Sequence, residues 1–411
     1  MLTVDEALER VLTAVRPPLA ERVSLEQAFG RVLAETLRSP RDVPPWANSA
    51  MDGFAVVAAD TAQAPVRLRV LETIGAGSVP TQTVTSGTAS RIMTGAPVPP
   101  GADAVVMVEH TDNGAEVVEV RATARPGQHV RPRGDDVRLD QVVLEAGRTL
   151  DPAAVGLCSA LGIPSVMVAQ RPRVAILSTG DEVVEVGWPL APGQIYSSNT
   201  LSLMGLVREA GAEAVHCGIA PDDPEGLRAA LQRCLRAELV LTTGGVSVGD
   251  FDYVKDVFDD VGAALDFWKV AMKPGKPLAF GALVGVPVFG LPGNPVSCMV
   301  NFLQFVRPVL RSMLGDPRPY LPTVDVRLTA PIRKHPGRAL LARLTLAPGP
   351  DGLPLATPTS SQSSGVLMSM VHGDALSLLA EDAETARAGD VVRAQVLRWG
   401  WMNGAEPGYG W

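Results

Sequence analysis

The sequence LVLTTGGVSVGDFDY fills residues 239–253 and decides the expected fold. Its first five residues, Leu239–Thr243, form an apolar, β-branched run that predicts a buried strand. The run ends abruptly at Gly244 and Gly245, where glycine stops a strand and leaves backbone amides without strand partners. A buried strand that stops in a glycine-rich loop is typical of the ligand-binding edge of a parallel sheet.

Two further loops carry the same kind of signal. Residues 286–289 predict a strand that runs into Gly290-Leu291-Pro292-Gly293-Asn294-Pro295 and then into the apolar helical segment 296–314. Asn294 is a candidate N-cap and Pro295 suits the first helical position, so free helix amides would face an anion. In Met272-Lys273-Pro274-Gly275-Lys276-Pro277 the prolines fix the chain between two ammonium groups that can face one oxyanion.

The order of apolar patterns predicts several domains. Runs with strand and helix spacing alternate from residue 173 (174–179, 201–210, 214–219, 224–235 and 239–243), which indicates a parallel sheet covered by helices. Short alternating runs between glycine and proline turns fill residues 42–135 and predict an all-β insert. Thr3 and Glu6 form a capping-box pattern ahead of an apolar stripe at helical spacing, and residues 339–346 are one of the strand-like runs of the C-terminal part. The expected fold is α/β plus β: a parallel α/β sheet domain (1–23 and 169–317), a small connecting domain (24–41 and 136–168), the insert (42–135), a C-terminal β-barrel-like domain (318–400) and a loose tail (401–411).

Composition narrows the class of protein. The 411 residues are 46% hydrophobic and 19% charged, with a net charge of −8, which argues against a nucleic-acid partner. The four cysteines are widely spaced and form no CxxC pair, so neither a zinc site nor a disulfide framework is expected. The N-terminus lacks the pattern of a signal peptide and no long uncharged apolar run follows, so a cytoplasmic protein without a membrane partner is expected.

Carboxylates gather at the predicted strand ends. They are Asp181, Glu182, Asp222, Asp250 and Asp252, and any one of them alone could be a helix cap or a solvated loop residue. Carboxylates repel phosphate, so a divalent cation that bridges them to an anionic substrate is the economical chemistry, and hard oxygen ligands favour Mg²⁺.

Several motifs together resemble one enzyme family. They are Asn48-Ser49-Ala50-Met51-Asp52-Gly53, Met93-Thr94-Gly95-Ala96-Pro97, Ser178-Thr179-Gly180-Asp181-Glu182, Thr243-Gly244-Gly245-Val246-Ser247-Val248-Gly249, the lysine loop 272–277 and Leu291-Pro292-Gly293-Asn294-Pro295. In this order they resemble the molybdopterin molybdenumtransferases of the MoeA type, which also form the C-terminal domain of gephyrin. The resemblance extends over about residues 2–397.

The resemblance implies an enzyme of molybdenum cofactor biosynthesis. Such an enzyme takes adenylylated molybdopterin and molybdate, inserts the metal into the dithiolene and releases AMP with the help of Mg²⁺. The family forms elongated homodimers whose cleft lies between the sheet domain of one subunit and the β insert of the other. Transient contact with a molybdopterin adenylyltransferase is also expected.

The resemblance further assigns roles to residues. The expected catalytic residues are Asp52, Thr94 and Asp136 from the partner subunit, with Glu182, Asp222 and Asp252. Asp222 and Asp252 are also the expected ligands of Mg²⁺. The expected substrate-binding residues are Ser178, Thr179, Gly180, Asp181, Gly244, Gly245, Ser247, Gly249, Asp250, Pro292, Gly293, Asn294 and Pro295. Molybdate is expected at Lys273, Lys276 and Pro277, completed by Arg338 or Arg343 and by a serine of the 361–365 segment, Ser363 or Ser364.

The sequence departs from the family at one strand end and leaves two other functions open. Where the family commonly has Asp before Ser-Asn, this chain has Tyr196-Ser197-Ser198-Asn199. A molybdopterin adenylyltransferase would resemble only the sheet domain, and a non-catalytic scaffold would need docking elements outside these domains. A dinucleotide-dependent oxidoreductase is disfavoured because no G-x-G-x-x-G follows an early strand.

Overall fold

The computed structural model describes residues 1–16, 19–244 and 264–403, and the chain divides into two compact units. The larger unit comprises Met1–Glu21, Gly30–Ala34 and Val168–Trp411. The smaller unit comprises Arg22–Phe29 and Glu35–Met167.

A mixed sheet forms the centre of the larger unit. Its described strands follow the order β15-β12-β16-β20-β19-β17, in which β15 to β20 are parallel and β19 and β17 are antiparallel. The strands are β12 (Arg173–Thr179), β15 (Glu213–Ala220), β16 (Leu239–Thr243), β17 (Ala264–Lys269), β19 (Pro277–Leu283) and β20 (Val286–Leu291). The four parallel strands are those that the sequence predicts.

The antiparallel part of the sheet is a correction to the predicted parallel sheet. Strands β19 and β20 are joined by the two-residue turn Val284-Gly285, in which φ is 51° and 77°. Such a turn normally carries Asn or Asp at its first position, because branched residues rarely adopt positive φ. The hairpin is therefore hidden from sequence-based reasoning.

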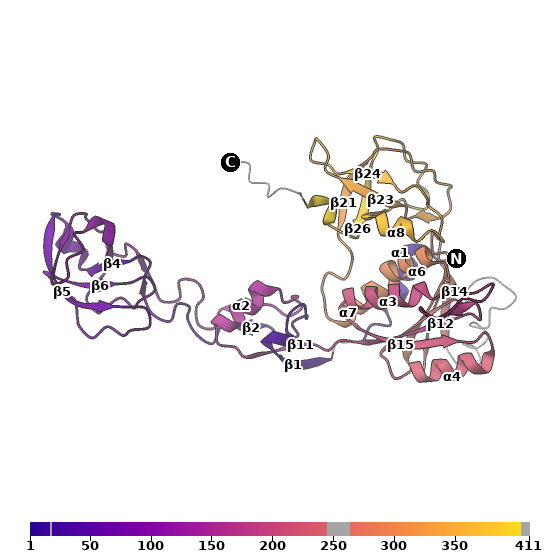
Figure 1. Cartoon of the computed structure of the whole chain (residues 1–411), viewed down its shortest axis with the longest axis horizontal. Coiled ribbons are helices and arrows are strands. Elements are labelled where there is room, and N and C mark those ends of the chain that lie inside the picture. Colours follow the sequence, from indigo (N-terminus) through magenta and orange to yellow (C-terminus); the bar gives the residue numbers. More distant parts are fainter. Residues whose placement is uncertain (17–18, 245–263, 404–411) are drawn as a thin grey trace. The chain divides into compact units, whose positions relative to one another are not determined.

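Alternation along β12 produces two apolar layers. Val174 and Ile176 pack with Leu203 and Val207 of helix α3 (Ser198–Glu209). Ala175 and Leu177 pack instead with Leu227 and Leu231 of α4 (Pro224–Cys234), and Figure 1 shows α4 beside β12 and β15. Because successive side chains of a strand point to opposite faces, helices cover both faces of the sheet.

The predicted helix after the Pro292-Gly293 loop forms in three pieces. Helix α6 (Pro295–Asn301) continues through a π-helical turn, η4 (Phe302–Val306), into α7 (Arg307–Met313). Pro295 occupies the start of α6 as predicted, and Asn294 has the extended N-cap backbone but makes no side-chain cap hydrogen bond. At the N-terminus Thr3 and Glu6 form the predicted capping box of α1 (Val4–Leu12).

A closed barrel follows in the C-terminal region, confirming the barrel-like domain. Its described strands are β21 (Thr323–Leu328), β24 (Leu355–Pro358), β23 (Arg343–Ala347), β25 (Ala375–Ser377) and β26 (Val391–Val396). The predicted single run 339–346 is divided, because β22 (Ala339–Leu340) leaves the barrel to pair with β18 (Met272–Lys273). The unit also contains the parallel pair β13 (Val183–Val184) and β14 (Ile195–Tyr196), helix α8 (Met368–His372) and the turn η5 (Gly400–Met402).

The smaller unit is built around a β-sheet, as predicted for the insert. Its strand order is β7-β4-β6-β5-β8, with one apolar cluster around Phe54 and Val56 and another around Ala55 and Ile92. The strands are β4 (Gly53–Val56), β5 (Val66–Ile74), β6 (Thr88–Ile92), β7 (Ala104–Met107) and β8 (Val117–Val120). Other elements are the pairs β3 (Asn48–Ser49) with β9 (Val130–Arg131) and β2 (Leu37–Arg38) with β10 (Val142–Leu144), helix α2 (Pro152–Ala160), and the turns η1 (Leu25–Gln27), η2 (Ala58–Thr61) and η3 (Val108–His110). Strand β1 (Ala20–Ser24) pairs with β11 (Ser165–Ala169).

In the described ranges, no helix has both the length and the apolar character needed to cross a bilayer.

Candidate functional site

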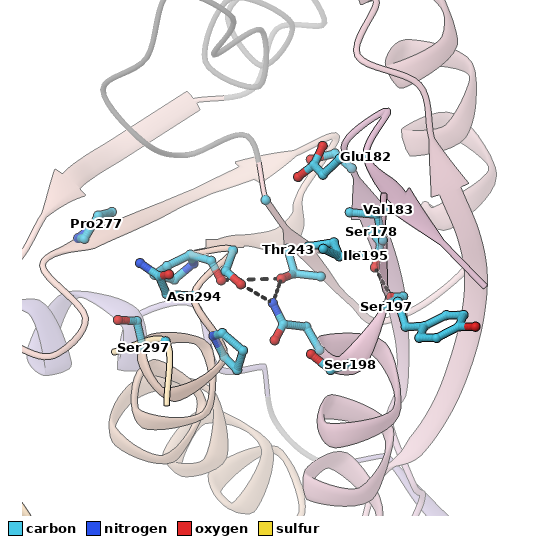
Figure 2. Close-up of a pocket in the computed structure, with 18 residues that line it drawn as sticks. Ser178, Glu182, Val183, Ile195, Ser197, Ser198, Thr243, Pro277, Asn294 and Ser297 are labelled. Atoms are coloured by element: carbon cyan, nitrogen blue, oxygen red, sulfur yellow. Dashed lines mark hydrogen bonds between the residues drawn. The ribbon is translucent and has the colours of Figure 1, made fainter. Parts of the chain in front are cut away.

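A cavity of about 550 Å³ lies at the carboxyl ends of the parallel strands of the larger unit. Figure 2 shows Ser178 at the end of β12, Thr243 at the end of β16 and Asn294 ahead of α6 around it. Loops at the carboxyl edge of a parallel sheet are where ligands of such folds bind. The lining residues are Ser178, Thr179, Glu182, Val183, Ile195, Tyr196, Ser197, Ser198, Asn199, Thr243, Gly244, Pro277, Pro292, Gly293, Asn294, Pro295, Ser297 and Gly365.

Glycines allow the strand-end loops to approach one another. Gly244 has φ of 94°, and a Cβ at this position would lie 2.6 Å from the carbonyl oxygen of Thr179. Gly180 has φ of 127°, and a Cβ there would lie 2.5 Å from a carboxylate oxygen of Glu182. Both positions favour glycine for their backbone conformation, and Gly244 does so for space as well, because the nearest atom to a Cβ there belongs to the backbone.

Three buried hydroxyl groups lie where the carboxyl end of β12 meets the start of α3. The hydroxyl of Ser178 lies 3.2 Å from that of Ser197 and 2.7 Å from that of Thr200, and the last two lie 2.7 Å apart. All three side chains are buried. Ser197 stands where the family commonly has Asp, so this part of the cavity wall is a neutral hydroxyl ring and carries no carboxylate.

Asn199 connects three strand-end segments. Its Nδ2 donates to Thr243 Oγ1 and to the carbonyl oxygen of Gly293, each at 2.8 Å. Thr243 Oγ1 also lies 3.4 Å from the carbonyl oxygen of Pro292 and 3.8 Å from Cys298 Sγ. Burial raises the pKa of the Cys298 thiol to about 12, so the thiol is neutral in this network.

Three carboxylates cluster at the neighbouring edge. The amide of Asp222 donates to Asp181 Oδ1 at 3.1 Å, and Glu182 lines the cavity. Burial raises the pKa of Asp222, and the charges of Asp181 and Glu182 raise it further. In the described part of the chain, no group of three His, Cys, Asp or Glu side chains could by itself hold a metal ion.

The lysine loop is fixed from two sides. Asn301 Nδ2 donates to the carbonyl oxygen of Pro277 at 2.9 Å, and Gly275 (φ of 102°) leaves room for Asn301 Oδ1. Strand β18 pairs in parallel with β22, so Lys273 lies opposite Leu340. Pro277 lines the cavity, Lys273 is exposed and Lys276 is half-buried.

Structure separates the two candidate arginines. Arg338 is exposed, whereas Arg343 is 0% exposed. Arg343 Nε donates to Ser369 Oγ at 3.1 Å, and Nη2 donates to the carbonyl oxygens of Ser363 at 3.1 Å and Ser361 at 3.4 Å. Its Nη1 is buried without a hydrogen-bond partner among the described residues, and burial lowers the pKa of Arg343 to about 10.

The segment that holds Arg343 also reaches the cavity. The carbonyl oxygen of Ser364 accepts a hydrogen bond from the amide of Val296 in the first turn of α6. Gly365 lines the cavity, and a Cβ there would lie 4.0 Å from Asn294 Oδ1. Arg343 therefore belongs to a connected set of segments around the cavity, whereas Arg338 is exposed.

Two predicted residues meet in the smaller unit. Asp52 Oδ1 accepts hydrogen bonds from the amide and the hydroxyl of Thr94, each at 2.7 Å. These hydrogen bonds lower the pKa of Asp52, and the bond from the Thr94 backbone amide has the larger effect. Asp136 is exposed in the same unit, and its amide donates to the carbonyl oxygen of Val43 at 3.0 Å.

The structure thus brings together part of the predicted set. The predicted residues that line the cavity are Ser178, Thr179, Glu182, Gly244, Pro277, Pro292, Gly293, Asn294 and Pro295, whereas Gly180, Asp181, Asp222, Lys273, Lys276, Arg343, Ser363 and Ser364 lie on neighbouring segments. Gly245, Ser247, Gly249, Asp250 and Asp252 lie outside the described residues. The sequence does not predict Ile195, Tyr196 and Asn199 as lining residues, although their position just before a helical run, at a strand end, is a usable signal.

Comparison with protein families covers nearly the whole chain. Residues 2–162 match the MoeA N-terminal region (domains I and II), residues 175–312 a probable molybdopterin binding domain, and residues 325–397 the MoeA C-terminal region (domain IV). The chain belongs to the MoeA family of molybdopterin molybdenumtransferases.

Named relatives and a solved structure agree with this membership. Molybdopterin molybdenumtransferase 2 of Mycobacterium tuberculosis is 43% identical, over 84% of this chain and 88% of that protein. The molybdopterin molybdenumtransferase of Haemophilus influenzae is 37% identical, over 95% of this chain and 98% of that protein. A crystal structure of the molybdopterin biosynthesis MoeA protein from Pyrococcus horikosii superposes with a TM-score of 0.84 at 33% identity, over 97% of this chain and 100% of that chain.

The MoeA family membership confirms the enzyme class that the motifs predict. As a molybdopterin molybdenumtransferase, the chain is an enzyme of molybdenum cofactor biosynthesis. The multidomain fold with its C-terminal barrel is the fold of this family.

Proposed function

We propose that this chain inserts molybdenum from molybdate into adenylylated molybdopterin and releases AMP, with the reacting groups held at the cavity between β12, β16 and α6. The cavity has room for part of a nucleotide-sized ligand, and its wall offers hydroxyls, an amide and helix-terminal amides. Neutral donors of this kind suit the phosphate and heterocycle of such a substrate. The single observation that carries the proposal is the convergence of this cavity with a buried arginine and the lysine loop.

Molybdate is a tetrahedral dianion, and the proposed pocket supplies cationic donors for it. Lys273, Lys276 and Arg343 come from segments joined by the β18–β22 pairing, and Ser363 and Ser364 belong to the segment that accepts hydrogen bonds from Arg343 Nη2 and Val296. Arg343 is assigned in preference to Arg338, because its buried charge has no carboxylate partner among the described residues and an oxyanion would compensate it.

Mg²⁺ is proposed at the carboxylate cluster. Asp222 carries a raised pKa in the company of Asp181 and Glu182, so a cation there would relieve repulsion, and carboxylate oxygens are suitable ligands. Further oxygens would come from substrate phosphate, water and Asp252. When bound, Mg²⁺ neutralises charge on the phosphoanhydride, while Asp222 and Glu182 position it and Lys273 and Arg343 orient molybdate.

A homodimer is proposed as the active form. Asp52 and Thr94 form a pre-arranged pair in the smaller unit, and Asp136 lies exposed in the same unit. Placed at the cavity of a second copy, these groups would complete the site. Mixing two inactive variants, Asp52→Asn and Asp222→Asn, should then recover activity that neither has alone, because mixed dimers contain one intact site. No recovery after subunit exchange would contradict a shared site.

The test of the proposed reaction is the molybdate dependence of AMP release. Purified protein with adenylylated molybdopterin and Mg²⁺ should release AMP faster as molybdate is added. Lys273→Ala should raise the molybdate concentration needed for half-maximal rate, with Arg338→Ala as the matched control for loss of an exposed cation. An unchanged response of the Lys273 variant to molybdate would remove this residue from the pocket.

A further inference from the structure

Asn199 stands out among the cavity residues because it is the one described side chain whose amide joins three different strand-end segments. It lies in the first turn of α3, and its Nδ2 reaches the end of β16 at Thr243 and the loop after β20 at Gly293. These are the segments that lead into the glycine loop and into α6. The side chain is 9% exposed, so water does not compete strongly for these hydrogen bonds.

Both hydrogens of the Asn199 amide group are used, and both go to acceptors. A carbonyl oxygen such as that of Gly293 can only accept, so the group opposite it must be a donor. Thr243 Oγ1 accepts from Asn199 and has one hydrogen left for Pro292 O or Cys298 Sγ. The direction of the hydrogen bonds around Asn199 is therefore determined by its amide group, and an ionised carboxylate at position 199 would leave the carbonyl oxygen of Gly293 without this donor.

Asn199 Oδ1, in contrast, is buried and has no hydrogen-bond partner in the described structure. Leaving a buried acceptor unpaired is costly, so the residue is not explained by stability alone. A hydrophobic residue would remove this unpaired acceptor, but it would leave the carbonyl oxygen of Gly293 without the donor that Asn199 supplies. What Asn199 adds is a pair of hydrogen bonds that tie the first turn of α3 to two segments of the cavity wall.

We propose that Asn199 is a positioning residue of the molybdenumtransferase site, which holds the first turn of α3 against the end of β16 at Thr243 and against the loop Pro292-Gly293-Asn294. This inference rests on the proposed function for its kinetic readout. The end of β16 and the loop after β20 already lie side by side, because the amide of Gly244 donates to the carbonyl oxygen of Leu291 at 3.2 Å. Asn199 donates to both of these segments from α3, so its loss removes the side-chain hydrogen bonds that hold the start of α3 and its part of the cavity wall against them.

The expected effect is kinetic. Misplacement of binding groups by about 1 Å costs on the order of 100-fold in rate, so Asn199→Ala should lower kcat/KM for AMP release by about 10- to 100-fold. Thr243→Val should have a similar effect, and the double variant should be no slower than the slower single variant, because both changes break one network. Thr243→Ser keeps the hydroxyl and should recover most of the rate lost in Thr243→Val.

A buried threonine elsewhere provides the matched control. Thr61 Oγ1 donates to the carbonyl oxygen of Ala58 and accepts from the amide of Ala124, each at 2.8 Å, in the smaller unit and outside the cavity. Thr61→Val should lower the melting temperature but leave kcat/KM within about twofold of the native value. The comparison separates loss of a buried hydroxyl from loss of positioning.

Asn199→Asp gives a signature that a purely structural role would not produce. The ionised carboxylate has no donor for Gly293 O, and desolvation with two facing acceptors raises the pKa of such a group. Only the protonated form can donate, so kcat/KM of Asn199→Asp relative to native should rise as pH falls. The ratio for Asn199→Ala should stay flat.

The same proteins should be tested for equilibrium binding of adenylylated molybdopterin, which needs no turnover. Asn199→Ala should bind it about tenfold more weakly or worse, because the start of α3 is no longer held against the two strand-end segments. Native protein that binds but does not turn over would overturn the proposed function and leave this readout intact. Variants at 199 and 243 that lose only thermal stability, with native binding, native kcat/KM and no pH-dependent ratio, would overturn the positioning role.

Discussion

Replacing Arg343 with methionine is expected to weaken molybdate binding strongly while changing stability little. The guanidinium is 0% exposed and donates three hydrogen bonds, to Ser369 Oγ and to the carbonyl oxygens of Ser361 and Ser363. At a net value of about 1 kcal/mol each, their loss costs about 3 kcal/mol. Methionine has an apolar body that can occupy much of the vacated space, which limits any cavity term.

The opposing term comes from the buried charge. Burial lowers the pKa of Arg343 to about 10, and one pKa unit corresponds to about 1.4 kcal/mol, so the charged form is disfavoured by about 3 kcal/mol. Removing the charge removes this penalty and so adds about the same amount to the free energy of unfolding. The free energy of unfolding of Arg343→Met should therefore stay within about 2 kcal/mol of native, which is measured by urea unfolding without molybdate.

The affinity of Arg343→Met for molybdate, in contrast, should fall. A hydrogen bond between charged groups contributes about 1.5–3 kcal/mol, so the dissociation constant, measured by calorimetry, should rise by about 10- to 150-fold. Arg338→Met is the matched control, since it removes an exposed guanidinium from the same region, and it should leave the affinity near native. Native affinity in Arg343→Met would refute its place in the molybdate pocket, and a stability loss above about 5 kcal/mol would show a structural role instead.

Three substitutions and one Mg²⁺ titration of the native enzyme across pH test other parts of the site. Asp222→Asn should not destabilise the protein at neutral pH, because the raised pKa of Asp222 means that its ionised form is unfavourable in the fold. The same variant should lose Mg²⁺ stimulation of AMP release. A clear drop in its melting temperature would contradict the stability prediction. For the native enzyme the same raised pKa predicts that Mg²⁺ stimulation weakens on acidification before an ordinary Asp would protonate, measured as Mg²⁺ titrations across pH, and an unchanged Mg²⁺ requirement would count against Asp222 as a ligand. Gly244→Ala places a Cβ 2.6 Å from the carbonyl oxygen of Thr179 at φ of 94°. Substrate affinity should therefore fall, and the free energy of unfolding should drop by about 1–3 kcal/mol. Native affinity and stability in this variant would show that the ends of β12 and β16 can move apart without harm. Thr94→Val removes one donor to Asp52 and should raise the pKa of Asp52 toward its ordinary value, measured by NMR titration, whereas an unshifted pKa would mean that the Thr94 hydroxyl is not its partner in solution.

Sequence patterns predicted the regular parts of the fold for local reasons. The β-branched runs at 174–179 and 239–243 and the capping box at Thr3 and Glu6 each specify their element without distant contacts. The Val284-Gly285 hairpin was hidden because valine rarely adopts the positive φ that this turn requires. The split of residues 339–346 was hidden because β22 pairs with β18 and not with the barrel.

In the candidate site, too, features that depend on local sequence were predicted and features that depend on distant contacts were not. Glycine, proline and Asn294 located the strand-end loops that line the cavity, because these residues favour turns and helix starts through their own local conformational preferences. The choice between Arg338 and Arg343 needed burial, which depends on the barrel core around position 343. Asn199 was part of a recognised motif, but its role depends on hydrogen bonds to residues 44 and 94 positions away in sequence.

The central claim is that anhydride cleavage and metal insertion occur together at this cavity. The most direct measurement is a single-turnover reaction with excess enzyme, adenylylated molybdopterin, Mg²⁺ and molybdate, in which AMP and cofactor able to reconstitute a molybdoenzyme are quantified over the same time course. Equal amounts of both products, formed at the same rate and absent without molybdate, are predicted. AMP released at the same rate without molybdate, or cofactor formed without AMP, would contradict the coupled reaction.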